Sequence, residues 1–231
     1  MKTKDIMCAR AADKAEEIDK TKKTGMDIKE NVLHLIRHGK TEANEKRLYC
    51  GQTDLPLSEA GRLEIVGFAN KGIYPVSVRQ FFTSGLIRTE ETLDIIYGSV
   101  SREAVADLAE YRFGQYEMFS YEELKDREDY QAWIMDTTDT VACPGGESKQ
   151  QFKARVISGF LNIAAACTTA DEFILVVCHG GVITCIMDYL WPNIKNFYEW
   201  QPQPGRGYSL YFSYASGSKD DCRLPYGYGL I

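Results

Sequence analysis

The sequence predicts an α/β protein in which helices cover both faces of a mostly parallel central sheet. From Asn31 onward, short apolar runs alternate with longer segments of helical periodicity. The run at residues 173–178 is apolar throughout, as strands buried on both faces are. Alternation of this kind is typical of repeated β-α units, whose strands pair in parallel.

Five apolar runs are expected to form strands. The runs at 32–36 and 173–178 are placed in the centre of the sheet, because they lack polar alternation over most of their length. In chain order, the expected strands are residues 32–36, 80–83, 104–108, 173–178 and 208–214, the last of these being the final strand of the chain.

Helix caps mark the first two expected helices. Ser58 can cap a helix that runs to about residue 70. Its expected buried face contains Leu63, Val66, Phe68 and Ala69. The second helix covers residues 86–97, and Gly98 stops it.

Capping boxes open the next two helices, and a final helix covers residues 182–190. Ser120 with Glu123 predicts a helix to about residue 135, and Ser148 with Gln151 predicts another. The latter places apolar residues at steps of four, namely Phe152, Val156, Phe160 and Ala164.

Composition limits the classes of function. The 231 residues are 44% hydrophobic and 26% charged, which is typical of a globular protein of one large or two small domains. The net charge of −6 argues against a general nucleic-acid surface, so an anion site has to be built from a few placed cations. No run approaches the roughly 18 apolar residues that cross a bilayer, so no membrane partner is expected.

Residues 1–30 differ from the rest of the chain, since they are rich in Lys and Ala and poor in large apolar groups. We expect a helical or disordered extension there, no signal peptide, and a single domain over residues 31–231. Seven irregularly spaced Cys fit a reducing, cytoplasmic location, and Cys178 and Cys185 are interpreted as small core residues.

Two of the three histidines occupy the same kind of position. His38 follows the run 32–36 and His179 follows the run 173–178, each with Gly directly after it, and Arg37 precedes His38. Neighbouring parallel strands would bring both ends to one edge of the sheet. Because His is nucleophilic near neutral pH and Arg matches phosphate oxygens in pairs, the pattern predicts a phosphate site. Each His alone also fits a loop residue with a local hydrogen bond.

The third histidine and the cysteines do not suggest a metal site. His34 lies inside the first strand and is interpreted as structural. Cys178 and His179 are adjacent, so they would point to opposite faces of a strand. Because no CxxC, HxxxH or HxH spacing occurs, we expect no metal.

Further polar residues follow other predicted strands. Arg88 lies in the first turn of a helix, where the helix dipole disfavours a cation, so it needs an anionic partner. Glu110 follows the run 104–108, and Asn44 can donate its amide to a phosphate oxygen. Arg88 and Glu110 could also be ordinary surface charges. The loop at residues 51–58, which follows Asn44, and the turn at residues 144–148 could also be explained by ordinary turn chemistry.

Together, these segments resemble the histidine phosphatase superfamily, also called the phosphoglycerate mutase-like family. The resemblance covers about residues 31–213 and rests on four motifs in order. These are residues 35–44 (LIRHGKTEAN), the set Ser84, Leu86, Arg88 and Thr92, Glu110 followed by Phe113-Gly114, and His179-Gly180. The resemblance implies a three-layer α/β/α sandwich.

The resemblance also implies a role for each motif. His38 would be the nucleophile that becomes phosphohistidine, Glu110 the general acid, and Asn44 a secondary contact. The residues that would bind the phosphoryl group are Arg37, Arg88, His179 and Gly180. Two Arg and a protonated His179 could stabilise the transferring group without a metal or cofactor. Neighbouring positive charge would keep His38 neutral.

The same site serves phosphatases and mutases. The family's cofactor-dependent mutases carry a longer insertion after the acidic residue, whereas 35 residues separate Glu110 from Gly146 here. We therefore expect a short cap around residues 111–147 and a phosphatase.

Within the family, loop 51–58 with Phe113-Gly114 is similar to the α-ribazole phosphatase branch and to broad-specificity phosphatases. Tyr116 and Met118 stand where that branch has Trp and Gly. The expected partner is a small phosphorylated metabolite, with Arg47, Tyr49, Gln52 and Thr53 as candidate contacts. A phosphoglycerate mutase and a non-catalytic phospholigand-binding protein are the alternatives, although a binder would need neither nucleophile nor acid.

Overall fold

A six-stranded mixed sheet forms the centre of the protein. The computed structural model describes residues 28–165, 173–215 and 225–231. The strand order is β3-β2-β4-β1-β5-β6. These strands are β1 (Ile28–Arg37), β2 (Gln80–Thr83), β3 (Glu103–Ala104), β4 (Phe173–Cys178), β5 (Gly207–Ala215) and β6 (Gly227–Leu230). β1, β2, β3 and β4 pair in parallel, while β5 is antiparallel to both of its neighbours, so the predicted mostly parallel sheet is confirmed.

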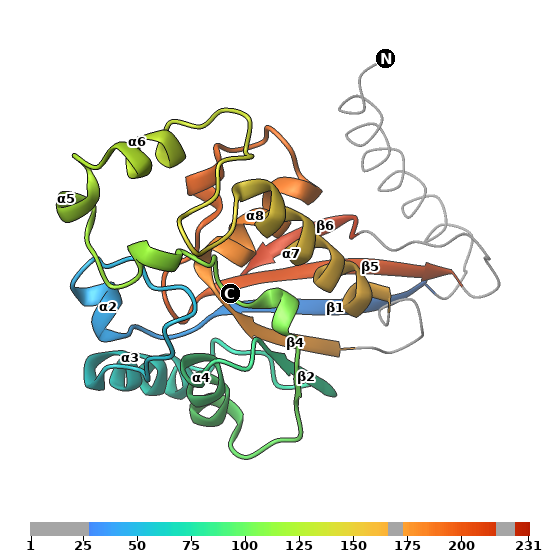
Figure 1. Cartoon of the computed structure of the whole chain (residues 1–231). Coiled ribbons are helices and arrows are strands. Elements are labelled where there is room, and N and C mark those ends of the chain that lie inside the picture. The colour runs from blue at the N-terminus through green and yellow to red at the C-terminus, as the bar shows by residue number, and fades with distance from the viewer. Residues whose placement is uncertain (1–27, 166–172, 216–224) are drawn as a thin grey trace.

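Helices lie on both faces of this sheet, as a three-layer sandwich requires (Figure 1). On one face lie α3 (Glu59–Asn70) and α4 (Ile87–Tyr97), and on the other α7 (Lys149–Ala164) and α8 (Gly180–Leu190). Side chains of β4 alternate between the two cores: Ile174 and Val176 join the α7–α8 side, and Leu175 and Val177 the α3–α4 side. β4 is therefore buried on both faces, as its apolar sequence predicts.

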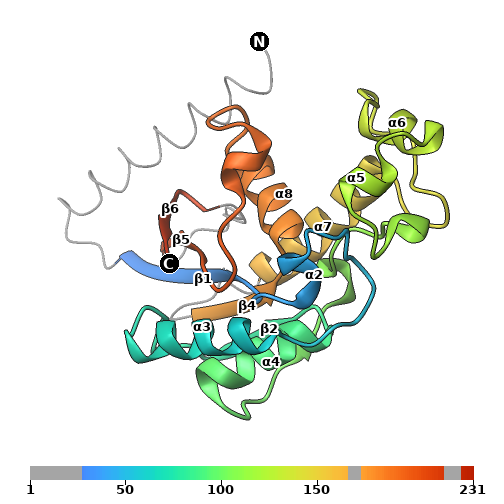
Figure 2. The same cartoon turned by 90° about the vertical axis from the view of Figure 1, so that its left-hand side faces the viewer.

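A segment of short helices lies away from the sheet, on the side where β1 continues into α2 (Glu42–Glu45) (Figure 2). It contains η2 (Gly114–Tyr116), α5 (Tyr121–Leu124) and α6 (Glu128–Ile134). Tyr111, Tyr116, Tyr130 and Trp133 pack together in this segment, with neighbouring rings 5.5–5.8 Å apart. This aromatic cluster joins the cap segment, residues 111–147, to the hydrophobic core on the α7–α8 side of the sheet.

Several expectations about single elements were wrong. Residues 120–135 form two helices, although the Ser120–Glu123 capping box is present. Leu124 and Trp133 would lie about 180° apart on one continuous helix. The extended backbone of Arg127 (ψ 132°) breaks the helix, and both side chains are buried.

The expected strand at 104–108 is also wrong. Only Glu103 and Ala104 pair with β2, and the chain then turns through η1 (Ala106–Leu108). The carbonyls of Asp107 and Ala109 accept hydrogen bonds from the Arg155 side chain rather than from a strand. The chain can leave the sheet here because the Arg155 side chain satisfies backbone carbonyls that would otherwise need a neighbouring strand.

The ends of the chain and one helix face need correction as well. β5 is not the last strand, since β6 pairs with it. β1 begins at Ile28, so residues 28–30 of the expected extension belong to the sheet, and residues 1–27 lie outside the described residues. In α3, Gly61 and Ile65 are buried, whereas Leu63 and Val66 are 66% and 41% exposed. At about 100° per residue, Leu63 lies about 200° and Val66 about 100° around the helix from Ile65.

The remaining elements agree with the sequence. Ser58 and Ser148 cap their helices, and the apolar residues of α7 spaced by four are all buried. Gly98 ends α4 with a φ of 74°. Within the described residues, no helix is both long and apolar enough to span a bilayer.

The corrected face of α3 gives a stability prediction. Ile65→Ala should lower the free energy of unfolding by about 2–5 kcal/mol, because it removes a fully buried side chain. Leu63→Ala in the same helix should change it by about 0.5 kcal/mol or less. Urea unfolding followed by circular dichroism measures both, and equal losses in the two variants would contradict the assignment of the buried face.

Candidate active site

The pairing of β1 with β4 brings the two histidines together. Arg37, the last residue of β1, is in register with Cys178, the last residue of β4. His38 and His179 follow directly, and their ring centroids lie 5.1 Å apart with an interplanar angle of 64°. Both rings are buried, with 5% and 0% exposure. The parallel register therefore builds one imidazole pair at the carboxyl edge of the sheet.

His38 has a defined tautomer. Its Nδ1 lies 2.7 Å from the carbonyl oxygen of Gly39. A carbonyl only accepts hydrogen bonds, so Nδ1 carries the proton and Nε2 keeps its lone pair. Burial, followed by the charges of Arg88 and Arg37, holds the pKa of His38 well below 6.5 despite the Gly39 hydrogen bond. His38 is therefore a neutral imidazole with a free nitrogen.

Two arginines supply positive charge beside this ring. Arg88 is 1% exposed in the first turn of α4, and its guanidinium donates to the carbonyls of Gly51 (2.6 Å) and Thr53 (3.0 Å). Arg37 is half-buried and donates through Nη1 to the carbonyl of Pro202 at 2.8 Å. Neutral carbonyl partners orient the arginines without cancelling their charge.

His179 occupies the N-cap position of α8 without a side-chain capping bond, and its Nε2 lies 2.8 Å from the hydroxyl of Ser84. Burial and then the charge of Arg88 hold the pKa of His179 well below 6.5, with His38, Arg37 and Arg155 adding to the effect. Both effects disfavour the protonated form of His179 in the free site. Within the described structure, the buried His179 Nδ1 and Arg37 Nε have no hydrogen-bond partner. An anion with several oxygens would match both atoms.

Glu110 lies at the start of α8. Its carboxylate accepts hydrogen bonds from the backbone N–H groups of Tyr111 (2.9 Å) and Gly181 (3.0 Å). A Cβ on Gly181 would lie 2.4 Å from Oε1 of Glu110, so a side chain there would displace the carboxylate. The absence of a side chain at residue 181 lets the acid approach the helix start.

Comparison with known proteins assigns this site to a family. The sequence profile of the histidine phosphatase superfamily (branch 1) matches residues 33–213. The chain belongs to this superfamily.

Relatives whose names give different activities match this chain. The chain is 32% identical to an adenosylcobalamin/alpha-ribazole phosphatase of Salmonella typhimurium, over 67% of this chain and 77% of that protein. It is 28% identical to a 2,3-bisphosphoglycerate-dependent phosphoglycerate mutase of Nitrobacter winogradskyi, over 69% and 81%. A crystal structure of a candidate alpha-ribazole-5′-P phosphatase from Escherichia coli matches with a TM-score of 0.70 and 25% identity, covering 87% of this chain and 94% of that one.

Asn44 and Gly180 are the remaining residues that the sequence analysis predicts to contact phosphate. The side-chain oxygen of Asn44 accepts hydrogen bonds from the backbone and hydroxyl of Thr41 and so caps α2. Gly180 lies against Arg37, because a Cβ there would be 3.1 Å from the Cζ of Arg37 and 2.6 Å from the amide nitrogen of Gln201. Gln201 is a neighbour of the site that the sequence analysis missed.

The four candidate substrate contacts have different surroundings. Gln52 donates to the carbonyl of Glu110 at 2.9 Å, and the carbonyl of Thr53 accepts from Arg88. The hydroxyl of Tyr49 lies 2.6 Å from that of Tyr130 in the cap segment. Arg47 is exposed and has a φ of 55°. Gln52 and Thr53 thus make contacts within the site, whereas Tyr49 belongs to the edge of the cap segment.

The sequence analysis also missed Glu117, which fixes the loop beneath Arg88. Its carboxylate accepts from the backbone N–H groups of Gly51, Gln52 and Thr53 and from the Thr53 hydroxyl, at 2.6–3.1 Å. Burial alone would raise the pKa of Glu117, but these hydrogen bonds outweigh it and lower the pKa below 4.5. No sequence signal distinguishes this Glu from a surface charge, because its partners are backbone atoms.

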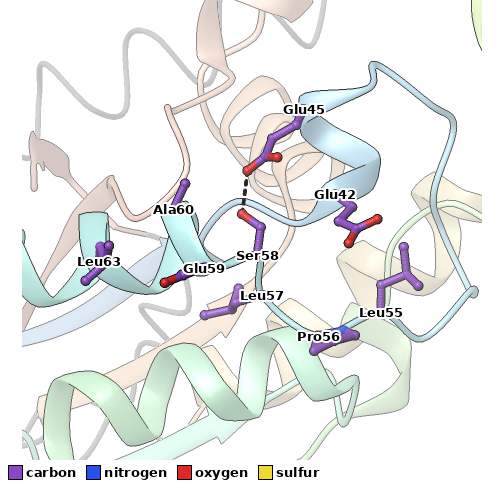
Figure 3. A pocket seen from close by; sticks show the side chains of 9 residues that line it. All are labelled: Glu42, Glu45, Leu55, Pro56, Leu57, Ser58, Glu59, Ala60 and Leu63. Carbon is purple, nitrogen blue, oxygen red and sulfur yellow. Dashed lines mark hydrogen bonds between the residues drawn. The ribbon is translucent and has the colours of Figure 1, made fainter.

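A pocket of about 670 Å³ opens beside the site but is not part of it. Figure 3 shows it between α2, residues 55–58 and the start of α3. Its lining combines apolar side chains with Glu42, Glu45 and Glu59, and the Ser58 hydroxyl donates to Glu45 at 2.5 Å. Three carboxylates repel a phosphate group, so this pocket does not compete with the imidazole pair for an anion. The described residues also contain no cluster of three or more His, Cys, Asp or Glu suited to a metal.

Glu117 gives a pH-dependent prediction. Because its pKa is lower in the folded chain than in the unfolded chain, the ionised carboxylate stabilises the fold above about pH 4.5, and this contribution is lost as the pH falls through the folded-state pKa. Glu117→Gln should lower the free energy of unfolding by about 1–3 kcal/mol at pH 7. The difference from the wild type should shrink as the pH falls below 4.5 and through the folded-state pKa, as measured by urea unfolding at each pH. A difference that is constant with pH would exclude the ionised carboxylate as its source.

Proposed function

We propose that this protein is a metal-independent phosphomonoesterase that acts on a small phosphorylated metabolite through a phosphohistidine intermediate. The observation that carries the proposal is the neutral His38, whose Nε2 lone pair lies among buried cations and beside a second imidazole. A non-catalytic binding site would require the cations but not a free nucleophilic nitrogen.

In the first step, Nε2 of His38 attacks phosphorus, and the bond from phosphorus to the ester oxygen breaks. Charge in the transition state lies on three equatorial oxygens, and Arg37, Arg88, His179 and the backbone of Gly180 would bind them. His179 would donate from Nδ1 while Nε2 accepts from Ser84. Glu110 would give its proton to the leaving alkoxide, and Asn44 would make a secondary contact.

In the second step, the carboxylate of Glu110 takes a proton from water. The resulting hydroxide attacks phosphorus, the bond from phosphorus to Nε2 of His38 breaks, and inorganic phosphate leaves. Glu110 is then protonated and His38 is neutral, so the site returns to its starting state. Bonds and protons balance without a metal or a cofactor.

Mutase activity is the second candidate, since a phosphoglycerate mutase is among the relatives. A mutase has to exclude water while its phosphoenzyme waits for an acceptor. The α-helices of the cap segment, α5 and α6, are short, with four and seven residues, which favours access of water and therefore hydrolysis. Adding 3-phosphoglycerate with 2,3-bisphosphoglycerate and measuring 2-phosphoglycerate against inorganic phosphate separates the two activities.

The substrate is best sought by a panel of sugar phosphates, phosphoglycerates, nucleotides and α-ribazole phosphate. Arg47, Tyr49, Gln52 and Thr53 remain the proposed contacts for the leaving group. A tenfold preference in kcat/KM for one class would identify the substrate chemistry.

Removing the nucleophile tests the proposed reaction. His38→Ala should lower turnover of p-nitrophenyl phosphate in EDTA by about 1,000-fold or more and abolish acid-labile phosphate on the protein. His34→Ala is the matched control, because His34 is a buried histidine of β1, the strand that leads to His38, and it hydrogen-bonds to Ser209. The control should stay active. Binding of phosphate esters without turnover by the wild type would instead support a binding protein.

A side chain at residue 181 tests the position of the acid. Gly181→Ala places a Cβ against the end of the flexible Glu110 side chain, so the carboxylate should move while the fold is kept. We expect kcat/KM for an alkyl phosphate to fall by about 100-fold, within the range attributed to positioned proton transfer. Thermal stability should not fall, since Ala is intrinsically favoured over Gly in a helix. Unchanged activity would rule out a role for the observed Glu110 position.

A further inference from the structure

A buried ion pair lies behind Glu110, outside the phosphate site. Arg155 of α7 and Glu147, which lies two residues before α7, have only 12% and 6% side-chain exposure. The pair is bidentate, with Nη2 to Oε1 at 2.6 Å and Nε to Oε2 at 3.0 Å. Neither residue belongs to the proposed reaction as described above.

Arg155 makes five hydrogen bonds, as many as a guanidinium has N–H groups. Two go to Glu147, and three go to the carbonyls of Asp107 (2.9 Å), Ala109 (2.7 Å) and Glu110 (2.9 Å). The carbonyls of Ala109 and Glu110 belong to the two peptide groups on either side of the Glu110 Cα. The guanidinium therefore fixes both peptide planes from which the Glu110 side chain extends.

Glu147 holds the chain just after Glu110. Its Oε1 accepts from the backbone N–H of Arg112 at 2.9 Å, and its own N–H donates to the carbonyl of Arg112 at 3.0 Å. The hydroxyl of Tyr111 donates to the carbonyl of Glu147 at 2.8 Å. Residues 107–112 are thus bound to this pair before and after Glu110.

The energetics do not explain the pair as a source of stability. Burying two ions costs desolvation free energy that their attraction often does no more than offset. The planar guanidinium fixes the directions of three contacts to the chain around Glu110, which an apolar pair would not do.

We propose that Arg155, held by Glu147, is a positioning residue that directs the Glu110 carboxylate toward the leaving oxygen. This inference rests on the proposed function, in which Glu110 is the general acid. Its consequence is specific: loss of Arg155 harms the protonation of a poor leaving group more than the attack of His38. Alkyl phosphates should therefore suffer more than aryl phosphates.

The test compares two substrates in the full-length protein. Measurements of kcat/KM, which report the phosphorylation step, are made with p-nitrophenyl phosphate, whose leaving group needs little protonation, and with glycerol 2-phosphate, whose alkoxide needs a proton. The variants are Arg155→Lys, Arg155→Met, Glu147→Gln and Glu110→Gln. Lys153→Met is the matched control, since Lys153 lies in the same helix and pairs with Asp139 at the surface.

We expect Arg155→Lys and Glu147→Gln to lower kcat/KM for glycerol 2-phosphate at least tenfold more than for p-nitrophenyl phosphate. Glu110→Gln should show the same pattern more strongly, and Lys153→Met should change neither value. Arg155→Lys keeps the charge but not the fork, so it carries the test where Arg155→Met fails to fold.

Equal losses on both substrates, or no loss, in Arg155→Lys would overturn the positioning role while Glu110→Gln keeps its preference for the good leaving group. A Glu110→Gln variant that treats both substrates alike would instead refute the general acid of the proposed function. The two failures are therefore distinguishable.

Discussion

The parallel pairing of β1 with β4 is the constraint on which the rest of the site depends. Its register aligns Arg37 with Cys178, so the next residue of each strand is a histidine at the same edge of the sheet. The backbone N–H of His38 donates to the carbonyl of Cys178 at 3.0 Å, which continues the pairing into the site. A slip by one residue would turn one imidazole to the opposite face and separate the rings.

The second requirement is positive charge inside the site. Two arginines supply it, and backbone carbonyls rather than carboxylates hold them in place. Arg88 is bound by carbonyls of the loop at 51–53, and Arg37 by the carbonyl of Pro202. These contacts orient the guanidinium groups and leave their charge available to an anion. Burial, together with the same charges, keeps the pKa of both histidines low, so one environment serves phosphate binding and nucleophile activation.

Much of this could be predicted from the sequence, because it depends on neighbours along the chain. The apolar runs before His38 and His179, the caps at Ser58 and Ser148 and the ordered motifs predicted the α/β class and the family, and both are confirmed. Predictions failed where distant contacts decide the outcome. Hydrogen bonds from Arg155 hold residues 107–110 away from the sheet. The helix expected over 120–135 is broken at Arg127, where the chain turns so that Leu124 and Trp133 are both buried.

The sequence by itself determined which residue types end the central strands, and hence the class of chemistry available to the chain. Only the tertiary structure decided the state and support of those residues. Glu117 lies 66 positions from Gly51 and Arg155 lies 45 from Glu110, and their partners are backbone groups that carry no sequence signature. The lowered pKa of His179 likewise follows from burial and from Arg88, which are set by packing rather than by adjacent residues.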